Sequence, residues 1–121
     1  MMLFSRRSLV LGALALGALP SQAADKLQLV MFDRVGCPWC AKWDQEVGNV
    51  YHKTWEGEPA PLRRLSMHPP YPSDLAFITG ILYSPTFVLV KGRREIGRIV
   101  GYPGEAHFYV QLSQLIEKAG T

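Results

Sequence analysis

The sequence has few of the residues that build metal centres or disulfide frameworks: two cysteines and three histidines among 121 residues. Two cysteines exclude a scaffold of several disulfides. No second C-x-x-C and no Cys/His pair stands at zinc spacing, so we expect neither a metal site nor a bound cofactor. The basic pairs are short and far apart, which argues against a nucleic-acid surface. Internal repeats, low-complexity tracts and linkers are also lacking.

The longest apolar run is too short to cross a membrane, because it covers the eleven residues 9–19 whereas a spanning helix needs about 20. Two arginines precede this run, and Ser21-Gln22-Ala23 follows it with small residues suited to cleavage. We therefore interpret 1–23 as an export signal and 24–121 as one periplasmic domain. The signal takes two of the thirteen basic residues, so eleven basic and ten acidic residues remain, a net charge of +1.

Both cysteines lie in one short motif, Cys37-Pro38-Trp39-Cys40. The apolar run 27–32 before it is typical of a central strand, and a helical pattern follows it. The start of a helix stabilises a thiolate through amide N–H groups and the dipole, and a thiol at i+3 can close a ring with the first. The motif therefore predicts thiol–disulfide exchange, in which Cys37 has a lowered pKa and attacks, and Cys40 resolves. No acidic cluster is evident nearby.

Other interpretations use the same two cysteines. An inert disulfide would stabilise the fold only weakly, because its loop is short. A non-catalytic copper(I) carrier would use the thiols as soft ligands, although no Met-rich or His-rich segment accompanies them. The motif also leaves the direction of exchange open between reductase and oxidase or isomerase, since the potentials of such pairs span about −270 to −120 mV.

The remaining patterns predict the element order β-α-β-α-β-β-α. We expect strands at 27–32, 62–67, 83–90 and 95–100, and helices at 38–52, at 73–79 with Ser73 as N-cap, and after Gly104. If the first two strands are parallel, His68 lies near the active edge, either as a base or contact or as an ordinary loop residue.

Two helices should each present an apolar face to the core. On the first helix, Cys37 should lie at the exposed tip and the inward face should comprise Cys40, Trp43, Val47, Val50 and Tyr51. On the last helix, the apolar stripe comprises Phe108, Leu112, Leu115, Ile116 and Ala119.

Three motifs in this order resemble the thioredoxin superfamily in its compact form: the C-x-x-C after a strand, Ser84-Pro85-Thr86-Phe87 before a hairpin, and Gly101 after the last strand. The resemblance implies a three-layer α/β/α domain around a four-stranded mixed sheet. It also implies that Pro85 is cis and packs against the disulfide. In such proteins Ser84 would pair with the substrate backbone, and Gly101 would leave room for the substrate.

Other residues leave alternatives open. Trp39 either contacts a partner at the rim of the site or packs against Trp43. Tyr102 and Phe108 are better explained by packing than by recognition. The buried carboxylate that thioredoxins carry six residues before the first cysteine is here Met31. Proton removal from Cys40 then falls to water, to Asp33 or to another group, and Asp33 is more simply a solvated turn residue.

A closer resemblance is to the periplasmic thioredoxin-like proteins of bacterial sulfur-oxidation (Sox) clusters, the SoxS family. It is carried by the stretches 60–64, 85–90 and 95–102. It implies that the protein keeps the reactive cysteine of a sulfur-carrier protein reduced, with electrons from a membrane thiol transporter. We therefore predict a monomeric oxidoreductase without a cofactor, acting on a disulfide-containing periplasmic protein.

Overall fold

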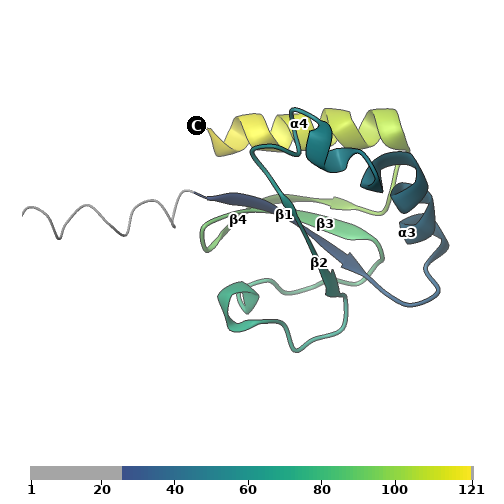
Figure 1. The fold of residues 1–121 in the computed structure, drawn as a ribbon. Helices are drawn as coiled ribbons and strands as arrows, with labels where there is room; N and C mark the ends of the chain where they lie inside the picture. Colours follow the sequence, from purple (N-terminus) through teal and green to yellow (C-terminus); the bar gives the residue numbers. More distant parts are fainter. Residues whose placement is uncertain (1–25, 121) are drawn as a thin grey trace, which may run out of the picture.

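The computed structural model describes residues 26–120, and the export signal predicted for 1–23 lies outside them. A four-stranded sheet runs in the order β2-β1-β3-β4 (Figure 1). Its strands are β1 (Leu27–Asp33), β2 (Leu62–Ser66), β3 (Thr86–Lys91) and β4 (Arg94–Val100). The α-helices of the described residues are α3 (Pro38–Trp43) and α4 (Glu105–Ala119). β1 is parallel to β2 and antiparallel to β3, which confirms the predicted mixed sheet.

The central strands β1 and β3 are apolar on both faces because each face is covered. α3 and α4 cover one face, and the chain between β2 and β3 covers the other (Figure 1). Successive side chains of a strand point to opposite faces. Leu29 and Met31 accordingly join the core under the helices, whereas Val30 and Phe32 join the second core.

The helical segment after the cysteines is divided into three parts. α3 ends at Trp43 and continues as a π-helical turn, Asp44–Gly48, followed by a 3-10 turn, Tyr51–Lys53. The segment 38–52 is therefore helical in three different pieces, and the prediction of one continuous helix is wrong. The wider turn changes which side chains face inward, so Val50 is 46% exposed whereas Tyr51 is buried.

The expected helix over 73–79 is a single 3-10 turn, Ser73–Leu75, and Ser73 does not cap it. Its hydrogen bonds join residues three apart, as from Leu75 N–H to the Pro72 carbonyl at 2.9 Å. The β-branched residues Ile78 and Thr79 favour a helix weakly, and the Asp74 carboxylate is held by Arg63 at 2.7 Å. The third layer of this fold is thus an irregular segment rather than a helix.

α4 packs against the sheet as predicted. Phe108, Leu112 and Ala119 are buried, while the polar side of the helix is exposed. β4 lies at the edge of the sheet and approaches α4 closely at Gly97, where an added Cβ would lie 2.5 Å from Leu115 Cδ2. Among residues 26–120 there is no helix with the length and apolar character needed to cross a bilayer.

Candidate dithiol site

Cys37 and Cys40 form a disulfide at the start of α3. β1 delivers the chain to this point, and Gly36 makes the turn with a φ of +76°, a conformation that favours glycine. Cys37 is the N-cap of α3, and its Sγ accepts a hydrogen bond from the Cys40 backbone N–H at 3.2 Å. Pro38 occupies the first turn, where its missing N–H costs nothing.

The loop before β3 lies against the same sulfur. The Ser84 hydroxyl donates to Cys37 Sγ at 3.3 Å, and the Ser84–Pro85 peptide bond is cis, as the resemblance implied. The Gly101 N–H donates to the Pro85 carbonyl at 2.7 Å, which ties this loop to the end of β4. Gly101 has a φ of +81° with open space where a Cβ would point, so the backbone conformation, not packing, calls for glycine here.

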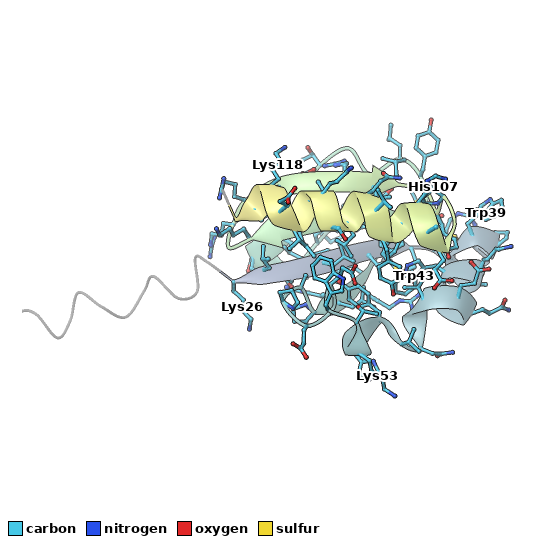
Figure 2. The ribbon with its side chains drawn as sticks, turned by 90° about the horizontal axis from the view of Figure 1, so that it is seen from above. Lys26, Trp39, Trp43, Lys53, His107 and Lys118 are labelled. Carbon is cyan, nitrogen blue, oxygen red and sulfur yellow. A yellow bond between two sulfur atoms is a disulfide. The ribbon has the colours of Figure 1, made fainter. Side chains whose placement is uncertain are left out.

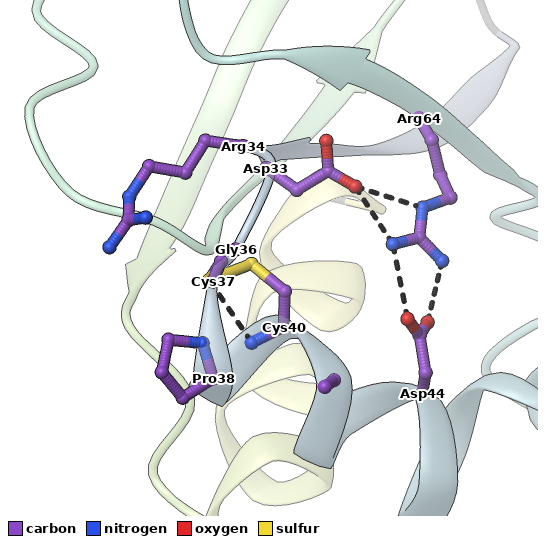
Figure 3. Close-up of a pocket in the computed structure, with 9 residues that line it drawn as sticks. Asp33, Arg34, Gly36, Cys37, Pro38, Cys40, Asp44 and Arg64 are labelled. Carbon is purple, nitrogen blue, oxygen red and sulfur yellow. Dashed lines mark hydrogen bonds and ion pairs between the residues drawn. A yellow bond between two sulfur atoms is a disulfide. The ribbon is translucent and has the colours of Figure 1, made fainter.

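Both cysteines are buried, Cys37 to 6% exposure and Cys40 to 5%. The expected contrast between an exposed Cys37 and a buried Cys40 is therefore wrong for the disulfide form. The Cys37 Sγ is held between the Cys40 N–H of the first turn of α3 and the Ser84 hydroxyl. Both residues nevertheless line an open pocket of about 360 Å³ (Figure 3). A reactant can approach the disulfide through this pocket.

Four charged residues line the pocket together with the cysteines: Asp33, Arg34, Asp44 and Arg64. The Arg64 guanidinium lies between two carboxylates (Figure 3), with Nη2 at 2.8 Å from Asp33 Oδ2 and Nη1 at 2.5 Å from Asp44 Oδ1. The hydrogen bonds to Asp44, and also those to Asp33, raise the pKa of Arg64 above its ordinary value. Although the sequence showed no acidic cluster near Cys37, two carboxylates lie in this pocket, and a permanent cation bridges them.

The sequence interpretation missed Arg64 and Asp44. One signal lay in strand parity: Met31 is paired with Arg64 in the register of β1 and β2, and Asp33 follows Met31 by two positions. Side chains of paired residues, and of residues two apart, share a face of a sheet. Asp33 and Arg64 therefore meet on the helical side, where Asp44 enters from the turn after α3.

The sequence left open whether Trp39 contacts a partner or packs against Trp43. Trp39 is 56% exposed and points outward at the end of the molecule where α3 lies (Figure 2). Trp43 is fully buried, and its ring contacts are with Tyr51, Phe87 and Phe108, so it is not the packing partner considered for Trp39.

The remaining expected residues lie outside the pocket. His68 follows β2, as expected, but it is exposed and does not line the pocket. Tyr102 is buried, and its hydroxyl donates to Glu46 Oε1 at 2.6 Å, so it joins the loop after β4 to the turn after α3. Burial, and then this hydrogen bond, raise the pKa of Tyr102. Across residues 26–120, no group of three or more His, Cys, Asp or Glu side chains is placed to hold a metal ion.

A mixed four-stranded sheet with a C-x-x-C disulfide at a helix start, beside a cis-prolyl loop, defines a thiol–disulfide oxidoreductase of the thioredoxin type. Among solved structures, the chain is similar to the periplasmic thioredoxin SoxS from Paracoccus pantotrophus in its reduced form. The identity is 45% and the TM-score 0.74, over 77% of this chain and 98% of that one. The chain therefore belongs to the thioredoxin superfamily.

More distant structures share the fold alone. Thioredoxin from Fasciola hepatica is 20% identical with a TM-score of 0.59, over 84% of this chain and 92% of that one. Thioredoxin from Malassezia sympodialis is 24% identical with a TM-score of 0.56, over 78% and 80%. No family model and no curated protein matches the chain.

Proposed function

We propose that the protein is a periplasmic reductase that opens disulfides of a partner protein through its reduced Cys37–Cys40 dithiol. The reductase direction comes from the resemblance to SoxS-type proteins. The observation that carries the exchange mechanism is the asymmetry of hydrogen-bond donors around the two sulfurs. Cys37 Sγ accepts from the Cys40 N–H and from the Ser84 hydroxyl, whereas no donor among residues 26–120 reaches Cys40 Sγ. Donors stabilise negative charge, so Cys37 is the sulfur that reacts as a thiolate.

The reaction then has two steps. The Cys37 thiolate attacks the partner disulfide, forms a mixed disulfide and releases one partner sulfur. Cys40 attacks Cys37 Sγ next, which releases the second partner sulfur and restores the Cys37–Cys40 disulfide. The i+3 spacing makes the second step intramolecular, and its high effective concentration favours release of the partner.

The surface around the dithiol suits a protein substrate. Val35, Trp39, Leu82 and Tyr83 are exposed apolar residues within a few positions of Cys37 or Ser84 in the sequence. An exposed aromatic side chain next to a reactive group contributes contact area to a partner. We propose that the partner chain lies against Trp39, Ser84, Pro85 and Gly101 while its sulfur is joined to Cys37.

The proposed location is supported by the similarity to SoxS, which is described as a periplasmic thioredoxin. The proposed partner is what the resemblance to proteins of Sox clusters implies. We propose export to the periplasm, a sulfur-carrier protein with a reactive cysteine as the substrate, and a membrane thiol transporter as the source of electrons. A reductase in an oxidising compartment must be recharged by some electron donor, and a membrane thiol transporter would meet that need.

Trapping tests the mechanism. In Cys40→Ser the second step is blocked, so the variant should accumulate a covalent complex with its substrate that dithiothreitol releases. Cys37→Ser is the matched control, since it keeps one thiol at the same site but should trap nothing. Trapping by Cys37→Ser alone would reverse the assignment of the two sulfurs, and equal trapping by both variants would contradict a distinct attacking sulfur. The redox potential of the pair, measured against glutathione, decides between the reductase and an oxidase.

A further inference from the structure

We propose that Asp33 is the base that takes the proton from the Cys40 thiol in the second step, and that Arg64 holds the Asp33 carboxylate in position for it. This inference rests on the proposed exchange reaction and deepens it.

The second step needs a base at neutral pH. An ordinary thiol titrates near pH 8.5, so only a few per cent of it is thiolate at pH 7. Cys40 Sγ has no hydrogen-bond donor among residues 26–120 to stabilise its thiolate, and Met31 contributes no titratable group. The charged groups that line the pocket are Asp33, Arg34, Asp44 and Arg64, so two carboxylates compete for the role.

The hydrogen bonds distinguish these two carboxylates. Both oxygens of Asp44 are occupied by Arg64, with Nη1 at 2.5 Å from Oδ1 and Nη2 at 3.4 Å from Oδ2. Asp33 accepts both of its bonds from Arg64 through Oδ2 alone, at 3.2 Å from Nε and 2.8 Å from Nη2. Within the described part of the chain, Asp33 Oδ1 has no donor. Asp33 therefore keeps one oxygen available for a proton.

Arg64 is well placed as the positioning residue. It lies on β2, which pairs with β1 directly, so both members of the Asp33–Arg64 pair are fixed by the sheet. Its guanidinium carbon lies 6.0 Å from the centre of the Trp43 ring, and Trp43 is fully buried. The Asp33 side chain is only 26% exposed. Asp33 and Cys40 line the same pocket. A carboxylate held in this way is oriented before the reaction begins, and a general base can take a proton directly or through one water.

The step is balanced without any further reactant. The Cys40 S–H gives its proton to the Asp33 carboxylate, and the resulting thiolate attacks Cys37 Sγ. The Cys37–Cys40 bond forms as the bond between Cys37 and the partner sulfur breaks, and the partner leaves as a thiolate. The protonated Asp33 then releases its proton to that thiolate or to solvent. The dithiol is oxidised by two electrons, and the partner disulfide is reduced by two.

The test uses the aromatic disulfide 5,5′-dithiobis(2-nitrobenzoate) and the reduced full-length protein in stopped flow. Attack by Cys37 releases a first thionitrobenzoate, at a rate proportional to reagent concentration. Attack by Cys40 releases the second, at a rate independent of it. For Asp33→Asn at pH 6, we expect the second phase to slow at least ~10-fold and the first phase to change far less. The deficit should shrink towards pH 9, where Cys40 ionises without help.

Asp44→Asn is the matched control, because it removes an equal charge from the other carboxylate on the same guanidinium. Loss of that charge alone should shift both phases together and leave their ratio within about twofold, whereas Asp33→Asn should lower the ratio of second to first phase. An unchanged ratio in Asp33→Asn across pH 6–9, or an equal fall in Asp44→Asn, would overturn the proposal.

Arg64→Gln tests the positioning role separately, and it also serves if Asp33→Asn does not give a native circular-dichroism spectrum. We expect the second phase to slow at least ~3-fold at pH 6, with partial recovery in Arg64→Lys, which keeps a charge but not the planar fork. A second phase in Arg64→Gln as fast as in the wild type would remove Arg64 from the mechanism. These phases need no natural substrate. If the protein shows both kinetic phases but traps no partner protein, the proposed function is contradicted while the role of Asp33 stands.

Discussion

The two faces of the sheet are covered in different ways. On the helical face, the rings of Trp43, Phe87 and Phe108 pack against one another with centroids 4.9 to 5.9 Å apart, and both cysteines belong to the same core. On the other face, the cover is the segment 67–82 with its one 3-10 turn. The dithiol thus belongs to a closely packed aromatic core. The Ser84–Pro85 loop that contacts it follows the irregular segment in the chain.

On the irregular face, hydrogen bonds from side chains hold backbone carbonyls that are not part of a regular helix. Arg98 on β4 donates to the Gly80 carbonyl at 3.3 Å and to the Thr79 carbonyl at 3.1 Å. The Tyr71 hydroxyl donates to the Met67 carbonyl at 2.6 Å. These bonds hold backbone groups that a helix would have paired internally. A segment held in this way opens more readily than a packed helix, so the two faces should respond differently to substitution.

The largest effect should come from the aromatic core. Phe108→Ala removes a fully buried ring whose centroid lies 4.9 Å from that of Phe87, and we expect the free energy of unfolding to fall by about 3–5 kcal/mol. Chemical denaturation measures it. Val110→Ala, on the exposed side of the same helix, is the control and should cost less than ~0.5 kcal/mol. A small loss for Phe108→Ala would mean that this face is not the main source of stability.

Leu75→Ala makes the corresponding test on the irregular face. Leu75 is fully buried in the 3-10 turn. We expect a loss of about 2–3 kcal/mol, at the low end for a buried leucine, because an irregular segment can collapse into the cavity. The same denaturation series measures this loss. A cost equal to that of Phe108→Ala would show that the two faces are equally rigid and would remove the contrast.

Arg98→Ala should release the irregular segment without disturbing the core. We expect a loss of about 1–2 kcal/mol, since the side chain also pairs with Glu95 at 2.6 Å and bonds made by charged groups exceed neutral ones. Hydrogen exchange should show faster amides around 78–82 and unchanged amides in α4. Arg93→Ala, an exposed arginine in the adjacent turn, controls for the loss of charge. Equal exchange in both variants would contradict the tie.

Most of what could be predicted from the sequence lies in the sheet and on its helical face, and most of what could not lies in irregular segments. The central strands, α4 and the placement of the C-x-x-C rest on apolar patterns and spacing, which act within one element. The helix expected at 73–79 failed because the competing interactions were distant: Asp74 pairs with Arg63 on β2, and the turn packs on the second core. The prediction that Val50 faces the core failed because a π-turn cannot be distinguished from an α-turn by apolar spacing alone.

The site shows the same division. The Cys37–Cys40 pair could be expected from a local motif, whereas the cis bond before Pro85 could be expected only from the resemblance to the thioredoxin superfamily. The Arg64 bridge between Asp33 and Asp44 depends on strand register and on the turn after α3. It could not be predicted before these three residues, which are distant in sequence, were placed in the fold. The surroundings of Cys37 also include the Ser84 hydroxyl, which comes from a loop 47 residues further along the chain.

The smallest effect should come from Ser84→Ala, which tests whether the irregular side contributes to chemistry. The substitution removes one of two donors to Cys37 Sγ. A single hydrogen bond contributes about 0.5–1.5 kcal/mol, so alkylation of Cys37 by iodoacetamide near pH 7 should slow roughly 2- to 10-fold, with the gap closing at high pH. Ser84→Thr keeps the hydroxyl and should stay close to the wild type. If Ser84→Ala reacts as fast as Ser84→Thr at every pH, the Cys40 N–H and the start of α3 stabilise the thiolate unaided, and the irregular face serves only to position the substrate.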